Sequence, residues 1–270
     1  MSSRPRFLRR LGLADAVTVA NAALGLVTAV VVWFDTGLAA RLLLVAAVAD
    51  GLDGVVARHV GGTTVGPYLD SLADVASFGI APALLAVVVA LPEPPASRPL
   101  WSGTVIAVAA VYVAFAVVRL GVYTVEDEDS VVTHGVQTTL AGTVLAATVL
   151  AGLATPVVVV ALAAVLAPAM VTPVAYPDLH AQDALVMGVV QAVAVLTTGR
   201  LGETFAFALL FLAVGYAVLG PRFYWRDTGE TDGDAERAVD AEDGEDGNAE
   251  RSVASESGEP TECVDPADAR

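Results

Sequence analysis

The sequence predicts an all-α integral membrane protein, a bundle of about eight transmembrane helices. Three observations predict this class. Apolar residues make up 56% of the 270 residues, the mean hydropathy is +0.67, and the apolar residues are gathered in long blocks, unlike those of a soluble domain. The net charge is −16, and the segment after residue 226 carries most of it. We expect no nucleic-acid partner. The expected location is the cell membrane, which the chain crosses several times.

Eight apolar segments each come near the ~20 residues that a spanning helix needs. They cover residues 15–34, 38–59, 67–90, 102–123, 136–154, 156–172, 184–198 and 202–219. Proline-rich or charged stretches at 91–101, 125–135 and 175–183 separate several of them. The fifth and sixth are divided only by Ala154-Thr155-Pro156, and the seventh is short. The first is too long for the apolar part of a signal peptide, so we expect a retained helix.

The arginines predict the orientation and the domain limits. With eight spans and the N-terminus inside, the inner face holds four N-terminal arginines together with Arg58, Arg119, Arg222 and Arg226, and the outer face holds Arg41, Arg98 and Arg200. This bias predicts that both termini and the ends of the second and third helices are cytoplasmic. We expect a basic juxtamembrane segment at 1–14 and a membrane domain at 15–226. The segment 227–270 has sixteen acidic residues and three arginines, which predicts a disordered acidic tail.

Four aspartates stand where the neighbouring sequence indicates membrane, and a carboxylate is costly there. Asp50 and Asp53 are three residues apart at the end of the second helix, and Asp70 and Asp74 are four apart near the start of the third. Each pair lies on one helix face, so two helices joined by a short turn can direct four carboxylates at one point. Unpaired, these charges would repel one another. Two divalent cations would remove the repulsion, and oxygen ligands suit Mg²⁺ or Mn²⁺.

Small residues and one cation accompany the carboxylates. Gly54, Ala57 and Gly66 leave room for a bulky ligand against the backbone, and Arg58 adds a positive charge. Two metals beside space for phosphates are the machinery of phosphoryl transfer. Aspartates that only cap helices would explain one or two of the four carboxylates. A cation or lipid transporter is an alternative, but its acidic residues should be spread near the midplane of several helices.

The pattern Asp50-x2-Asp53-Gly54-x2-Ala57-Arg58-x7-Gly66-x3-Asp70-x3-Asp74 resembles the signature of the CDP-alcohol phosphatidyltransferases. It fixes eight positions over 25 residues; the spacer of seven is commonly eight in that family. The resemblance implies that the four aspartates bind two divalent metals and that the last, Asp74, is the general base. It also implies that Gly54, Ala57, Arg58 and Gly66 contact the CDP group, and that the protein is a homodimer.

Further stretches are similar to the serine-using branch of that family. They are DSLADVASFGIAP at 70–82, RLGVY at 119–123, HGVQTTLAG at 134–142, MVTPVAYP at 170–177 and TVANAALG at 18–25. RLGVY and HGVQTTLAG lack the second arginine and the proline of that branch. The similarity implies transfer of a phosphatidyl-type group from a CDP-lipid to L-serine with release of CMP, in phospholipid biosynthesis. The donor would be CDP-diacylglycerol or CDP-archaeol. All fourteen basic residues are arginine, which suggests a salt-loving archaeon and therefore CDP-archaeol. Codon bias explains the arginines equally well.

The acceptor pocket is predicted around two residues. Arg119 would bind the serine carboxylate or a phosphate, or would only anchor its helix at the headgroups. Ser77 continues the face of Asp70 and Asp74 and would border the acceptor. On the donor side, Asn21 would contact the nucleotide, or would only join two helices. Inositol phosphate or glycerol 3-phosphate is the alternative acceptor, and either should require a more basic pocket.

Overall fold

A computed structural model describes residues 11–91, 94–126, 132–177 and 181–223. Most of the predicted basic segment and all of the predicted acidic tail lie outside these residues. Within them the chain forms eight helical segments, one for each predicted apolar block. The helices are α1 (Leu13–Val31), α2 (Thr36–Val60), a continuous helix that comprises α3 (Gly66–Asp74), a π-helical turn (Val75–Ile80) and α4 (Ala81–Ala90), then α5 (Pro99–Glu126), α6 (Thr138–Leu150), α7 (Pro156–Ala169), α8 (Ala181–Leu196) and α9 (Gly199–Phe223).

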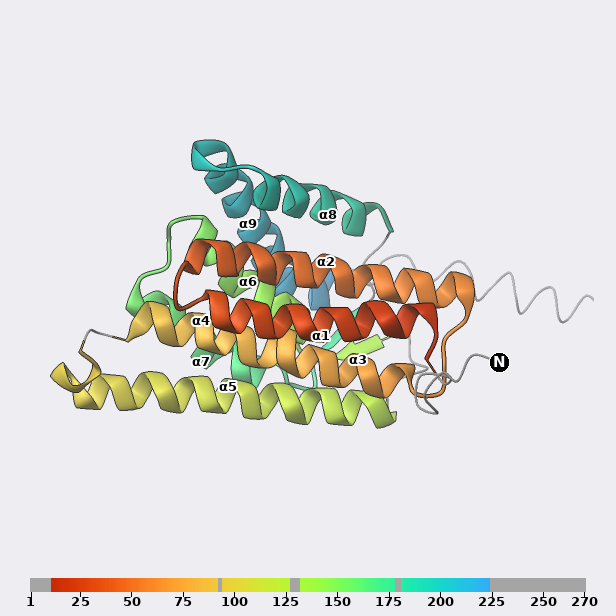
Figure 1. Cartoon of the computed structure of the whole chain (residues 1–270), viewed down its shortest axis with the longest axis horizontal. Coiled ribbons are helices and arrows are strands. Elements are labelled where there is room, and N and C mark those ends of the chain that lie inside the picture. Colours follow the sequence, from red (N-terminus) through yellow and green to blue (C-terminus); the bar gives the residue numbers. More distant parts are fainter. Residues whose placement is uncertain (1–10, 92–93, 127–131, 178–180, 224–270) are drawn as a thin grey trace, which may run out of the picture. The chain divides into compact units, whose positions relative to one another are not determined.

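Four of these segments are long and apolar enough to cross a membrane. They are Leu13–Val31, Gly66–Ala90, Pro99–Val125 and Gly199–Phe223. Helix α2 has 25 residues but is less apolar, because its second half carries the signature aspartates. In Figure 1, α1, α2, the continuous α3–α4 helix and α5 lie side by side with their axes roughly parallel. The chain is therefore a multi-pass helical membrane protein.

The fifth and sixth predicted spans are shorter than expected. Helix α6 has 13 residues and α7 has 14, so each is only about 20 Å long, against a hydrocarbon core of about 30 Å. Helix α6 ends at Leu150, and Thr155 caps α7 by accepting a hydrogen bond from the Val158 N–H at 3.3 Å. At its other end, α7 stops one residue after Pro168. Helix α6 therefore ends four residues before its predicted limit of 154, and α7 ends three residues before its predicted limit of 172.

The turn between α2 and α3 brings the two halves of the signature together. Gly61 follows α2 with a φ of +91°, a conformation that costs glycine little and other residues more. The Gly66 N–H then donates to the Thr63 carbonyl at 3.1 Å, where α3 begins. The chain reverses within a few residues, so the last turns of α2 lie beside the first turns of α3.

The π-helical turn begins directly after Asp74. Pro82 has no N–H, so a carbonyl one turn earlier loses its normal helical donor. The buried hydroxyl of Tyr112 on α5 donates to the Phe78 carbonyl at 3.2 Å and replaces that donor. Within the turn, the Ala81 N–H bonds to the Ala76 carbonyl, five residues back. Such turns occur often at functional sites, and this one is fixed by a tyrosine from another helix.

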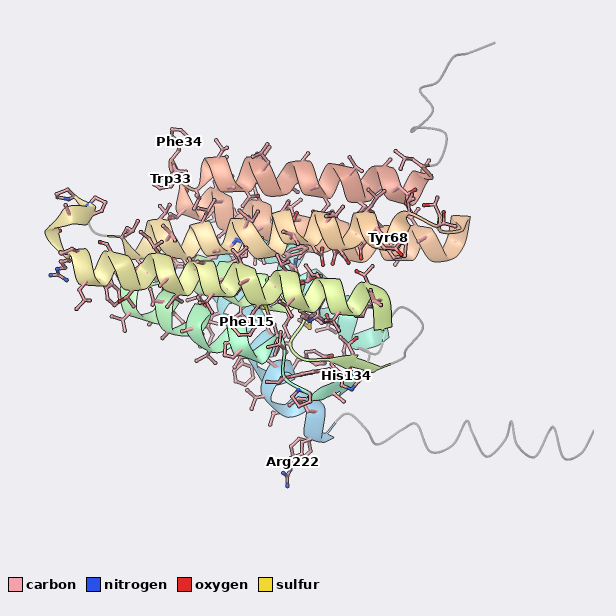
Figure 2. All side chains as sticks on the ribbon, turned by 90° about the horizontal axis from the view of Figure 1, so that it is seen from below. Trp33, Phe34, Tyr68, Phe115, His134 and Arg222 are labelled. Atoms are coloured by element: carbon pink, nitrogen blue, oxygen red, sulfur yellow. The ribbon has the colours of Figure 1, made fainter. Side chains whose placement is uncertain are left out.

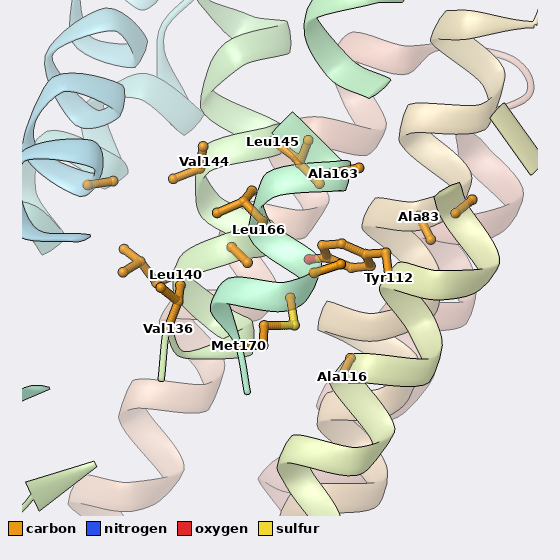
Figure 3. Packing of buried hydrophobic residues seen from close by; sticks show 14 of the residues in the cluster. Ala83, Tyr112, Ala116, Val136, Leu140, Val144, Leu145, Ala163, Leu166 and Met170 are labelled. Atoms are coloured by element: carbon orange, nitrogen blue, oxygen red, sulfur yellow. The ribbon is translucent and has the colours of Figure 1, made fainter. Parts of the chain in front are cut away.

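The main core lies between α4, α5, α6, α7 and α9. Figure 3 shows Tyr112 of α5 pointing toward Leu166 of α7 and toward Met170, the residue that follows α7. Beside this core, β1 (Val132–His134) pairs antiparallel with β2 (Ala175–Pro177), a short ribbon that the all-α prediction did not include. Figure 2 shows Trp33 and Phe34, which join α1 to α2, at the end of the helices far from Tyr68 of α3 and from His134.

Candidate active site

Three of the four signature carboxylates meet between α2 and α3. Asp50, Asp70 and Asp74 each offer one oxygen, and these oxygens lie within 4.8 Å of one another. Asp74 is buried, and the other two are half-buried. Each ionised pair at that separation repels by roughly 3 kcal/mol if the effective dielectric constant is about 20. A single neutral hydrogen bond contributes about 1 kcal/mol, so hydrogen bonds alone do not offset the repulsion.

Asp53, the fourth carboxylate, stands outside this group of three. It is buried, and its Oδ2 accepts a hydrogen bond of 2.7 Å from the Thr18 hydroxyl of α1. It lines a cavity together with Asp70. The predicted cluster is therefore a close group of three carboxylates with the fourth next to it.

Two cavities open on either side of Asp70. The larger, of about 320 Å³, lies among α1, α2, the α2–α3 turn and α3, and its lining includes Asp53. The smaller, of about 160 Å³, lies among α2, α3, α5, β1 and the start of α6, and its lining includes Asp50 and Asp74. Asp70 and Tyr123 line both. The carboxylate group thus lies at the boundary between two separately built spaces.

The residues predicted to contact CDP fall mainly on the larger cavity. Gly54, Ala57 and Gly66 all line it. The side chain of Arg58 lies outside the described side chains. Asn21 is buried on α1 and is not among the residues that line either cavity. Within the described part of the chain, both polar atoms of its amide lack a hydrogen-bonding partner.

The residues predicted to contact the acceptor are separated. Arg119 lines the smaller cavity with Asp74, is 9% exposed, and its guanidinium lies 5.7 Å from the centre of the Tyr123 ring. Ser77 is fully buried in the π-helical turn and donates to the Asn21 carbonyl at 2.9 Å. Neither cavity has Ser77 in its lining. Its hydrogen bond joins α1 to the π-helical turn, and its predicted role at the acceptor stays a prediction.

Several polar residues of the site are not apparent from the signature. Asp15 accepts hydrogen bonds from the Gly12 N–H at 2.7 Å and from the Thr63 hydroxyl at 2.8 Å, which ties the start of α1 to the α2–α3 turn. Thr138 and Thr139 of α6 contact two of the signature carboxylates. Each comes from a segment distant in sequence, and a threonine beside an apolar helix is not distinctive. Such a residue could be found from sequence only in an alignment of family members, if the same residue type recurred at its position.

The donor set fits a divalent cation. All three grouped ligands are carboxylates, the hard oxygen ligands that Mg²⁺ and Mn²⁺ take. Oδ1 of Asp74 is buried and, among the described residues, has no hydrogen-bonding partner, which leaves it available to a cation. A cation would also remove the mutual repulsion of the group.

Two comparisons with known proteins bear on the chemistry of this site. The family described as CDP-alcohol phosphatidyltransferase matches residues 11–198, which include both cavities' signature residues. A CDP-diacylglycerol–serine O-phosphatidyltransferase from Mycobacterium leprae (strain TN) is 39% identical over 90 residues. That match covers 32% of this chain and 30% of the relative, so the two are alike over about a third of each.

Proposed function

The chain belongs to the CDP-alcohol phosphatidyltransferase family, and we propose that it transfers the lipid phosphoryl group of a CDP-lipid to the hydroxyl of L-serine and releases CMP. The observation that carries this proposal is the pair of cavities that meet at Asp70. A transferase must hold a donor and an acceptor on opposite sides of the reacting phosphorus. The larger cavity suits the bulky nucleotide, and the smaller suits a compact acceptor.

The chain's own residues divide the work between the two cavities. Gly54, Ala57 and Gly66 let the nucleotide lie close to the backbone of α2 and α3. Divalent cations held by the four aspartates would neutralise the diphosphate charge. Asp74 accepts the proton of the serine hydroxyl, whose oxygen forms a bond to the lipid-side phosphorus while the bond from that phosphorus to the CMP oxygen breaks. CMP leaves with its phosphate, and no covalent enzyme intermediate is needed.

The smaller cavity favours serine over a phosphorylated acceptor. Among the described residues that line it, Arg119 is the one basic side chain, and it faces a wall with three carboxylates, Asp50, Asp70 and Asp74. One guanidinium suits the single carboxylate of serine. Inositol phosphate or glycerol 3-phosphate would bring a doubly charged group near that acidic wall. The partial relative from Mycobacterium leprae is named for the same acceptor.

The donor lipid, the orientation and the assembly extend this proposal. We take CDP-archaeol as the donor, because the acidic chain with arginine as its sole basic residue type suggests a salt-loving archaeon. The active site and both termini face the cytoplasm according to the arginine distribution. The protein works as a homodimer, as family members are expected to do.

A competition assay with purified enzyme tests the proposal. Protein in detergent with Mg²⁺ or Mn²⁺ receives CDP-archaeol or CDP-diacylglycerol together with serine, glycerol 3-phosphate and inositol phosphate at equal concentrations. Mass spectrometry of the lipids and measurement of CMP follow. We expect the serine lipid as the main product and faster turnover with CDP-archaeol. A main product that carries glycerol phosphate or inositol phosphate would overturn the acceptor, and the absence of metal-dependent CMP release would favour the transporter.

A further inference from the structure

Three threonines each direct a hydroxyl at a different signature carboxylate. Thr18 of α1 donates to Asp53 at 2.7 Å. Thr139 of α6 donates to Asp50 Oδ2 at 3.1 Å, and its neighbour Thr138 contacts Asp74 Oδ2 at 3.5 Å. The two α6 threonines occupy the first turn of their helix and also line the smaller cavity.

The first turn of α6 is held rigidly by the segment before it. Gly135 has a φ of +75°, and a Cβ there would come within 2.2 Å of the Met170 carbonyl oxygen, so no other residue fits. Its N–H donates to the Val174 carbonyl at 2.8 Å, and the next N–H, of Val136, donates to the Ala169 carbonyl at 3.0 Å. Two backbone hydrogen bonds to the end of α7 and the chain after it thus fix where α6 begins.

The ribbon adds a third anchor. The hydroxyl of Tyr176 on β2 donates to the Ala217 carbonyl of α9 at 2.8 Å. Burial raises the pKa of this phenol, so it stays protonated and keeps donating at physiological pH. The ribbon is therefore tied to α9, and β1 leads directly into the turn that carries Thr138 and Thr139.

We infer that Thr139, assisted by Thr138, is a positioning residue that orients the metal-binding carboxylates from α6. A donor to Oδ2 of Asp50 holds the carboxylate in one rotamer and leaves Oδ1 for a cation. Hydrogen bonds to ligating carboxylates of this kind commonly change metal affinity by about 10- to 100-fold when they are removed. This inference rests on the proposed function, because it assumes that the carboxylates bind a divalent cation.

The test measures Mn²⁺ binding to the full-length purified protein without substrate. Electron paramagnetic resonance of free Mn²⁺ gives the dissociation constant. Thr139→Val keeps the shape and removes the hydroxyl, whereas Thr139→Ser keeps the hydroxyl. We expect Mn²⁺ to bind about 10- to 100-fold more weakly to Thr139→Val and with near-native affinity to Thr139→Ser. Thr138→Val should have a smaller effect, because its contact is longer.

Thr143 provides a matched control. It is buried one turn further along α6, and its hydroxyl donates to a carbonyl of its own helix, that of Thr139, at 2.8 Å. Thr143→Val should bind Mn²⁺ as the native protein does. The inference is overturned if Thr139→Val binds normally, if Thr139→Ser loses as much as Thr139→Val, or if Thr143→Val loses equally.

A second control separates this inference from the function on which it rests. Asp70→Asn removes a ligand whose carboxylate, among the described residues, accepts no hydrogen bond from a threonine, and it should weaken Mn²⁺ binding severely. If Asp70→Asn binds Mn²⁺ like the native protein, the carboxylate group is not the metal site, and both proposals fail. If Asp70→Asn loses the metal but Thr139→Val does not, only the role of α6 fails.

Discussion

Replacing Arg119 tests the assignment of the smaller cavity to serine. Arg119 is almost fully buried and shares the lining of that cavity with Asp74, the proposed base. A hydrogen bond to a charged group contributes about 1.5–3 kcal/mol, and each 1.4 kcal/mol is about tenfold in affinity. We therefore expect Arg119→Ala to raise the KM for serine roughly 10- to 100-fold and to change the KM for the CDP-lipid much less.

The assay follows CMP release at saturating metal, with serine varied at saturating CDP-lipid and then the reverse. Metal saturation is needed because Arg119 interacts electrostatically with Asp74, so its loss also changes the metal site. Arg98→Ala is the matched control, since Arg98 is exposed just before the opposite end of α5. Arg119→Lys keeps the charge without the planar fork and should fall between the native protein and Arg119→Ala.

Two outcomes would refute this reasoning. An unchanged serine KM with normal turnover would reduce Arg119 to a membrane anchor. A loss confined to the CDP-lipid would assign Arg119 to the nucleotide and reopen the choice of acceptor.

Three further substitutions test other parts of the site. Asp70→Asn and Asp74→Asn should both abolish CMP release. Excess Mn²⁺ should restore a trace of CMP release only in Asp70→Asn, because Asp74 is also the proposed base. Equal rescue of the two variants would remove the distinct role of Asp74. Gly25→Ala should lower the free energy of unfolding by about 1–3 kcal/mol, because the new Cβ would lie 2.7 Å from the Ser77 hydroxyl oxygen and 2.8 Å from the Ser77 backbone nitrogen. An unchanged melting temperature in detergent would contradict the close packing of α1 on the π-helical turn. Asn21→Ala should leave the KM for the CDP-lipid unchanged, because Asn21 lines neither cavity, and it should not lower thermal stability, since the buried amide has no hydrogen bond to lose within the described chain. A raised KM would support the nucleotide contact that the sequence predicted.

The fold was predictable where apolar blocks and breakers decide it. All eight predicted segments are helices, and their limits mostly agree within three or four residues. The short length of α6 and α7 was not predicted, because apolar residues continue beyond Leu150 and Ala169, where the two helices end. The π-helical turn was not predicted either. It depends on a hydrogen bond from Tyr112, which is 34 residues away in sequence from Phe78.

The site was predictable to the extent that its parts are local in sequence. Asp50, Asp70 and Asp74 were expected to meet, and they do, because the turn at Gly61 is short. The threonine that holds Asp50 could not be inferred in this way, since Thr139 is 89 residues away in sequence. Only the packing of α6 against α2 brings the two together.

The proposed assignment of donor and acceptor to the two cavities explains why the signature indicates the donor and leaves the acceptor open. The larger cavity is built from α1, α2, the α2–α3 turn and α3, and it contains every small residue of the signature. The smaller cavity takes most of its remaining wall from α5, β1 and the start of α6, through residues such as Arg119, Thr133 and Gln137. Under the proposed assignment, acceptor choice can change by substitution in these later segments while the nucleotide side stays intact. The same segments also supply Thr139 to Asp50, so a change of acceptor wall would have to preserve that contact with the carboxylate group.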